Sequence, residues 1–144
     1  MTTEPHWDHF DDTRGAGVVG VGATLASAFG EAGRAITALV TDLADVTPRE
    51  DIEIKVRGRS REELLSGWMD AVIREMDSRQ MLFADFEVFV GDGEVVARVQ
   101  GERLDPDRHH PAVLPRRILG PAKLERAEED TWIARGVVEV ERPH

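Results

Sequence analysis

Two acidic segments of this 144-residue chain carry residue types that can bind a metal ion. The first is the run Asp8-His-Phe-Asp-Asp12, and the second contains Glu139 and Glu141 at alternating positions. Carboxylate oxygens are the ligands that calcium and magnesium prefer, and alternating residues of a strand lie on one face. If the two segments belong to neighbouring strands, Asp11 or Asp12 approaches Glu139 and offers oxygen ligands to a cation. Spacing alone favours the alternative that these acids are exposed and solvated.

Other catalytic chemistries find little support in the sequence. There is no cysteine, so thiolate nucleophiles, thiolate metal sites and disulfides are excluded. The histidines show no zinc-binding spacing, the glycines at 15–22 lack the Lys-Ser/Thr of a phosphate loop, and no serine lies in a nucleophile elbow. A two-metal hydrolase or nuclease using Asp11, Asp12 and Glu139 has too few converging ligands and no evident base. We therefore expect a protein that is not an enzyme.

The charge of the chain argues against direct binding of nucleic acid. The formal net charge is −10, whereas phosphate binding depends on neutralisation by cations. A modest basic strip lies between Arg103 and Arg126 and could touch RNA or an acidic partner, although such strips are usually solvated surface. No apolar run approaches the roughly 20 residues of a membrane helix, and residues 1–7 lack the pattern of a signal peptide. We expect a cytoplasmic protein that does not bind membranes.

The elements that must position these residues follow from periodicity. A short strand is expected at 18–21 and helices at 24–43 and 60–76, with Thr24 and the capping box Ser60-Arg-Glu-Glu63 at their starts. Gly30 and Gly33 indicate a helix face packed close to another element. Strands are expected at 52–56, in a hairpin of 81–90 with 95–99, and in a final pair of 116–124 with 132–140. Residues 101–115 read as a polar loop.

This order of elements predicts one α+β domain over residues 1–144. The economical packing is a mixed or antiparallel sheet with the two helices on one face.

Five fragments carry a resemblance to a known family. They are Gly22-Ala-Thr-Leu-Ala-Ser-Ala-Phe29, the stretch 40–50, Arg61-Glu-Glu-Leu-Leu65 with Trp68, the strand 83–88, and the loop Gly101-Glu-Arg-Leu-Asp-Pro-Asp-Arg-His109. In their order and spacing they resemble the archeases over nearly the whole chain. The loop is the most specific fragment, since it is similar to the family's Gly-Glu-Pro-x-Asp-Pro-x-Arg-His.

The resemblance implies an accessory protein for an RtcB-type RNA ligase in tRNA splicing or RNA repair. Such a protein promotes guanylylation and multiple turnover of the ligase and carries a cation site that reaches its active centre. Asp105, Arg108 and His109 are the expected partner-binding residues. The alternative is structural: Asp105-Pro106 begins a turn and Arg108 pairs with it.

The implied metal site departs from the family pattern. Its motif is His-Thr-Ala-Asp followed by a residue, a glycine and an apolar residue. Aligned without a gap, this chain has Asp12 in place of the histidine and Gly15 in place of the metal-binding aspartate. The C-terminal aspartate becomes Glu139. A Lys-x-x-Thr-x-His pattern in the preceding strand appears as Arg117, Gly120 and Ala122.

The implied ligands are therefore Asp11, Asp12, Glu139 and Val140, for calcium or another divalent cation. Loss of one carboxylate predicts a weak or absent site, unless a bulge at the glycines brings Asp11 or Asp12 in. The alternative function is a divergent protein-binding module of the same fold that has lost both the metal site and the ligase role.

Overall fold

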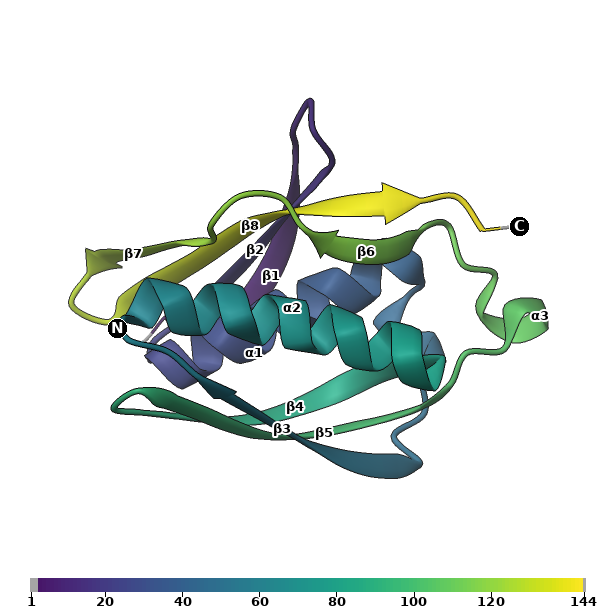
Figure 1. The fold of residues 1–144 in the computed structure, drawn as a ribbon, viewed down its shortest axis with the longest axis horizontal. Helices are drawn as coiled ribbons and strands as arrows, with labels where there is room; N and C mark the ends of the chain where they lie inside the picture. Colours follow the sequence, from purple (N-terminus) through teal and green to yellow (C-terminus); the bar gives the residue numbers. More distant parts are fainter. Residues whose placement is uncertain (1–2, 144) are drawn as a thin grey trace.

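The computed structural model describes residues 3–143 (Figure 1). Its elements are, in chain order, β1 (His6–Asp11), β2 (Ala16–Gly22), α1 (Leu25–Val40), the 3-10 turn η1 (Leu43–Asp45), β3 (Glu50–Arg57), α2 (Arg61–Arg79), β4 (Met81–Gly91), β5 (Glu94–Arg103), α3 (Pro106–His109), β6 (Leu114–Ile118), β7 (Lys123–Glu128) and β8 (Thr131–Glu141). Every strand pairing is antiparallel. The predicted α+β class with antiparallel strands is confirmed.

The strands form two sheets with α1 and α2 between them (Figure 1). One sheet has five strands, in the order β1-β2-β8-β6 with β7 also on β8, and the other has three, in the order β3-β5-β4. Where the sequence predicted one sheet, the structure has two, and the two helices cover one face of each. The large buried side chains Trp68, Phe29 and Phe83 fill the space between these layers. No helix in residues 3–143 is long and apolar enough to span a bilayer.

Both helices begin at the predicted cap residues. The Thr24 hydroxyl accepts a hydrogen bond from the backbone N–H of Ser27, and the Ser60 hydroxyl accepts one from Glu63. Helix α1 ends at Val40, three residues earlier than predicted, because Asp42 caps the separate η1 turn. The Trp68 indole of α2 donates to the carbonyl of Phe29 at 2.8 Å. The apolar stripe of this helix is buried throughout and consists of Leu64, Leu65, Trp68, Met69, Val72, Ile73 and Met76.

The sheet that contains both acidic segments differs from the sequence prediction in two places. Residues 6–11, which were not predicted as a strand, form β1 at the edge of the sheet. The predicted strand at 116–124 is two strands, β6 and β7, interrupted by Gly120 with φ +73° and by Pro121. Both pair with β8, whose other edge pairs with β2 from Ala16↔Val138 to Gly22↔Trp132. The strand that contains residues 18–21 is thus adjacent to the last strand, whereas β1, which carries Asp8 and Asp11, is separated from β8 by β2.

Candidate functional site

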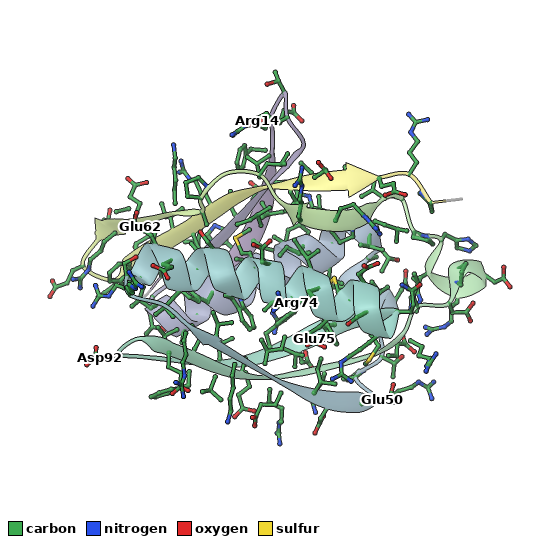
Figure 2. The ribbon with its side chains drawn as sticks, viewed as in Figure 1. Arg14, Glu50, Glu62, Arg74, Glu75 and Asp92 are labelled. Carbon is green, nitrogen blue, oxygen red and sulfur yellow. The ribbon has the colours of Figure 1, made fainter. Side chains whose placement is uncertain are left out.

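The implied metal ligands are distributed around the turn that joins β1 to β2. This turn projects from the sheet, with Arg14 close to its tip (Figure 2). Asp11, Asp12 and Val140 line one open hollow of about 500 Å³ beside Gly15 and Leu39. Glu139 does not line this hollow. The structure therefore brings together three of the four implied ligands.

Asp12 is engaged by a cation of its own turn. Its Oδ1 accepts hydrogen bonds from the backbone N–H of Arg14 at 2.9 Å and from Arg14 Nε at 3.0 Å. Its Oδ2 accepts from Arg14 Nη2 at 3.1 Å. The hydrogen bond from the guanidinium is the main cause that lowers the pKa of Asp12 from its ordinary value. Arg14 therefore occupies lone pairs that a metal ion would need.

Glu139 is likewise paired with an arginine, on the neighbouring strand. Arg117 Nη2 lies 3.3 Å from Glu139 Oε2, and Arg116 Nε lies 3.2 Å from Glu141 Oε2. A register shift between Pro115 and Arg117 accompanies this arrangement. Within residues 3–143, no group of three or more His, Cys, Asp or Glu side chains is arranged to hold a metal ion. In this arrangement the residues present do not fit a calcium site.

The backbone at the end of the β1–β2 turn, which we call the rim, requires a glycine at position 15. A Cβ atom at this position would overlap the carbonyl oxygen of Val138 and would lie 3.5 Å from the Cα of Glu139. An aspartate at position 15 would need a shift of the β2 or β8 backbone.

The hairpin geometry suggests a second alignment of the rim. The spacing His-x-x-Asp also occurs at His9 to Asp12, followed by Ala16-Gly17-Val18 if residues 13–15 are an insertion in the turn. These three residues lie in the projecting turn, where added length is tolerated. In this alignment Asp12, not Gly15, takes the position of the aspartate. His9 Nε2 donates to the carbonyl of Ala35 on α1 at 2.8 Å, so its ring is fixed against the helix.

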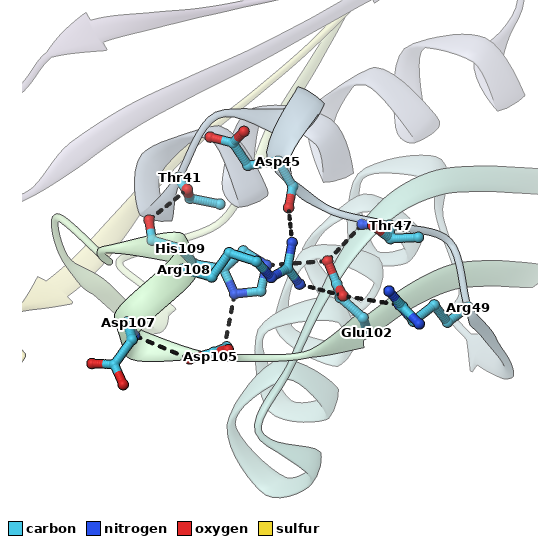
Figure 3. A network of polar contacts seen from close by, with 9 residues as sticks. All are labelled: Thr41, Asp45, Thr47, Arg49, Glu102, Asp105, Asp107, Arg108 and His109. Carbon is cyan, nitrogen blue, oxygen red and sulfur yellow. Dashed lines mark hydrogen bonds and ion pairs between the residues drawn. The ribbon is translucent and has the colours of Figure 1, made fainter.

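A second candidate site is a buried polar network centred on Glu102 (Figure 3). Glu102 lies on β5 and is 5% exposed. Its Oε2 accepts hydrogen bonds from the backbone N–H of Thr47 at 2.6 Å and from His109 Nε2 at 3.1 Å. Its Oε1 forms ion pairs with Arg108 and, at 3.4 Å, with Arg49 Nε. The carboxylate is therefore satisfied on both oxygens, as a buried charge must be.

These donors hold Glu102 ionised. The hydrogen bond from Arg108 is the largest cause that lowers the pKa of Glu102, and Thr47 and His109 add to it. Burial acts in the opposite direction, but the pKa still falls to about 2. Glu102 is thus a fixed negative charge beneath two arginines.

The hydrogen bonds of the two ring nitrogens define His109 as a neutral imidazole with a single tautomer. Its Nδ1 accepts a hydrogen bond from the backbone N–H of Asp105 at 2.9 Å, so the proton lies on Nε2 and is donated to Glu102. Its backbone carbonyl accepts from the Thr41 hydroxyl at 2.8 Å. The side chain of His109 is 0% exposed. It therefore braces the loop and does not lie on the surface.

Asp105 and Arg108 frame the same loop. Asp105 caps α3 by accepting from the backbone N–H of Asp107 at 3.0 Å, and Pro106 follows it, so the predicted turn is present. The ion-pair partner of Arg108 is Glu102, not Asp105, because the guanidinium points back towards β5. Arg108 Nη1 also donates to the carbonyl of Asp45 at 2.9 Å. The sequence reasoning missed Glu102, Thr47 and Arg49, although all three lie in the fragments that carry the family resemblance.

The surface above this network is an open hollow of about 430 Å³. It is lined by Arg49, Arg103, Arg108, Glu50 and Asp105, among others. The Arg49 side chain is 70% exposed and that of Arg108 is 44% exposed. Guanidinium groups are thus presented to solvent by a carboxylate and an imidazole that lie underneath. We refer to this region as the arginine hollow.

Comparisons with known proteins agree with the sequence resemblance. Residues 7–115 match the profile of the archease protein family (MTH1598/TM1083). The protein archease of Methanopyrus kandleri is 37% identical over 116 residues, covering 76% of this chain and 81% of the relative. The protein archease of Aeropyrum pernix is 30% identical over 139 residues, covering 93% and 96%. The solution structure of Methanobacterium thermoautotrophicum protein 1598 matches the fold with a TM-score of 0.67 at 21% identity, over 92% of this chain and 97% of that one.

Proposed function

Because the chain belongs to the archease family, we propose that it is an accessory protein that binds an RtcB-type RNA ligase and promotes its guanylylation and turnover. In this proposal the protein acts by contact and catalyses no reaction itself. The network around Glu102 is the observation that carries it. Two fragments that resemble the family, 40–50 and 101–109, are joined there by side-chain and backbone hydrogen bonds.

The network explains how the contact surface is held in place. Glu102 and His109 are buried, so they fix the loop, whereas Arg49, Arg103 and Arg108 face the arginine hollow. A buried carboxylate that anchors Arg108 reduces the side-chain freedom that binding would otherwise have to remove. Arginine is also enriched among residues that dominate protein–protein binding. We assign the ligase contact to this hollow.

The proposed function requires no metal ion at the rim of the β1–β2 turn. Asp12 of the turn is paired with Arg14, and Glu139 of β8 is paired with Arg117, in the arrangement described above. The same pairs favour the second candidate function, a protein-binding module of this family that no longer serves a ligase. Both candidates keep the arginine hollow as a contact surface. They differ in whether a ligase responds to the protein.

Multiple-turnover ligation separates the two candidates. The purified protein is mixed in stoichiometric amount with an RtcB-type ligase, GTP, a metal ion and RNA ends, and joined product is followed over many turnovers. Acceleration is expected from the native chain. If the ligase is not accelerated, the activator function is rejected and the binding-module function stands.

A pair of variants tests the assigned surface. Arg49→Glu with Arg103→Glu reverses two exposed charges of the hollow, and acceleration should then fall at least about tenfold, since rim charges govern encounter with a partner. Arg57→Glu is the matched control, because Arg57 is an exposed strand arginine of the same three-stranded sheet that lies outside the hollow. Circular dichroism checks that all variants fold. If acceleration fell equally in the control, or did not fall in the double variant, the arginine hollow would not be the ligase contact.

A further inference from the structure

A separate hollow of about 270 Å³ lies on the face of the five-stranded sheet that points away from the helices. Its lining includes Phe10, Arg14, Leu119, Lys123, Arg135 and Val137. On β8, Gly136 faces Met69 of α2, so its neighbours Arg135 and Val137 face outwards. No helix of the described chain covers this face (Figure 1). We call this region the outer hollow.

Two cations stand opposite each other across its floor. Lys123 of β7 and Arg135 of β8 are direct register partners, so their side chains share one face. Both residues are exposed, and neither side chain has a hydrogen bond or ion pair with any residue in the range 3–143. Like charges directly opposite on paired strands are destabilising. Although the chain has 28 acidic residues, none in the described part of the chain forms a carboxylate pair with these two cations.

An apolar surface adjoins the two cations. The ring of Phe10 lies flat on Gly17, since a Cβ atom there would be 2.5 Å from three ring carbons. Phe10 is 37% exposed, although it is a large apolar residue. Leu119 and the buried Val137 also line the hollow. Arg14 and Asp12 neutralise each other at its border, so Lys123 and Arg135 provide the uncompensated charge.

We propose that the outer hollow binds an acidic segment of a partner protein. Carboxylates of the segment lie against Lys123 and Arg135, and an apolar side chain covers Phe10. The overall charge of −10 disfavours an extended nucleic acid here, and a protein segment, unlike a phosphate backbone, also carries an aliphatic side chain that can cover Phe10. This inference goes beyond the proposed function and does not depend on a ligase.

Fluorescence anisotropy with a defined probe tests the proposal. The probe is a fluorescein-labelled decapeptide in which Glu-Glu-Leu-Glu-Glu is repeated twice, titrated with the intact protein at low salt. Binding that weakens at high salt is expected, because exposed charge pairs are screened. The matching peptide with lysine in place of glutamate should not bind. No detectable binding of the acidic peptide, or tighter binding of a decamer of oligouridine, would overturn the proposal.

Lys123→Glu provides a second, independent measurement. This variant removes one cation and creates an opposite-charge pair with Arg135, so peptide binding should weaken at least about fivefold. The melting temperature should rise by about 2 °C, because a repulsive cross-strand pair becomes attractive. Arg57→Glu is the control and should leave peptide binding unchanged.

The outcomes are distinguishable from those of the ligation assay. Unchanged peptide binding in Lys123→Glu contradicts the proposal, since the variant is expected to fold at least as well as the native chain. Sedimentation velocity shows whether a second copy of the chain fills the hollow. If the native chain is a dimer that Lys123→Glu dissociates, the occupant is a second copy and the proposal of an acidic partner is overturned. A monomer whose peptide binding weakens at least about fivefold in Lys123→Glu supports it.

Discussion

The Nε2 atom of His109 lies 3.1 Å from Oε2 of Glu102, with side-chain exposures of only 0% and 6%. His109→Ala removes this donor and also the acceptor of the Asp105 N–H. Loss of hydrogen-bond partners at a buried group costs about 1–3 kcal/mol, so we expect the free energy of unfolding to fall by about that amount. Urea denaturation followed by circular dichroism measures it. His110→Asn is the control, because asparagine tolerates the left-handed conformation at φ +48°, and an equal loss there would contradict the assignment.

The low pKa of Glu102 predicts a specific dependence of stability on pH. The folded-state pKa of about 2 lies below the ordinary value of 4.5. A depressed folded pKa contributes stability that is fully present above the unfolded pKa and is lost as pH falls towards the folded one. The native chain should therefore lose this contribution between pH 4.5 and about pH 2.

Glu102→Gln isolates that contribution. Glutamine is uncharged and cannot form an ion pair with Arg108 or Arg49, so the variant should be less stable than the native chain near neutral pH. The difference in free energy of unfolding between the two should shrink as the pH falls below 4.5, because the native carboxyl becomes protonated. Chemical denaturation at a series of pH values tests this. A difference that is constant with pH would show that Glu102 is not held ionised by the network.

Gly30 and Gly33 of α1 predict opposite effects of the same substitution. A Cβ at Gly30 would meet its nearest neighbours at 3.7 Å, which is ordinary contact, whereas one at Gly33 would lie 2.7 Å from a ring carbon of Phe86. Gly30→Ala should raise the free energy of unfolding by about 0.5–1 kcal/mol through helix propensity. Gly33→Ala should lower it by about 1–3 kcal/mol through overpacking. Thermal melting of both variants checks the sign, and the same sign in both would reject the predicted contact at Phe86.

The ion pair of Arg14 with Asp12 predicts how the rim responds to calcium. Arg14→Ala removes the hydrogen bonds that lower the pKa of Asp12, so that carboxylate becomes available to a cation beside Asp11. We expect calcium binding with a dissociation constant of roughly 10⁻³ M in the variant, typical of sites with few charged ligands. Calorimetry compares it with the native chain and with Arg14→Lys. Tight binding by the native chain that Glu139→Ala abolishes would show that the rim rearranges around a metal ion.

Gly15→Asp tests whether a carboxylate at position 15 is compatible with the rim. Its Cβ would overlap the carbonyl oxygen of Val138, so the substitution should lower the melting temperature. It should add no calcium binding of its own while Arg14 remains. Gly17→Ala is not a suitable control, because a Cβ there meets Phe10. Thr13→Asp, in the same exposed turn, is the matched control and should leave the melting temperature unchanged.

The fold was predictable where local periodicity and capping decide it. The stripe of α2, the caps Thr24 and Ser60 and the hairpin around Gly91 to Gly93 all follow from nearby residues. Strand β1 was not predictable in this way, because its sequence His-Trp-Asp-His-Phe-Asp lies at a sheet edge and is mostly exposed. The break between β6 and β7 did carry a local signal, the pair Gly120-Pro121, which ends a strand.

The candidate site was predictable only in part. The loop 101–109 identified the region, but the role of Glu102 depends on Thr47 and Arg49, which are distant in sequence. The pairing of Asp12 with Arg14 and of Glu139 with Arg117 depends on the geometry of a turn and on strand register. Hydrophobic periodicity contains no information on such contacts.

Strand β8 has a consequence for how this protein reaches its native state. Among the described strands it is synthesised last, yet β2 occupies one of its edges while β6 and β7 share the other. Until β8 leaves the ribosome, the strands made first and those made just before it have no common neighbour, and their unpaired edges are open to aggregation. The five-stranded sheet therefore forms after translation of residues 131–141, and early arrest of synthesis should leave a product that chaperones retain.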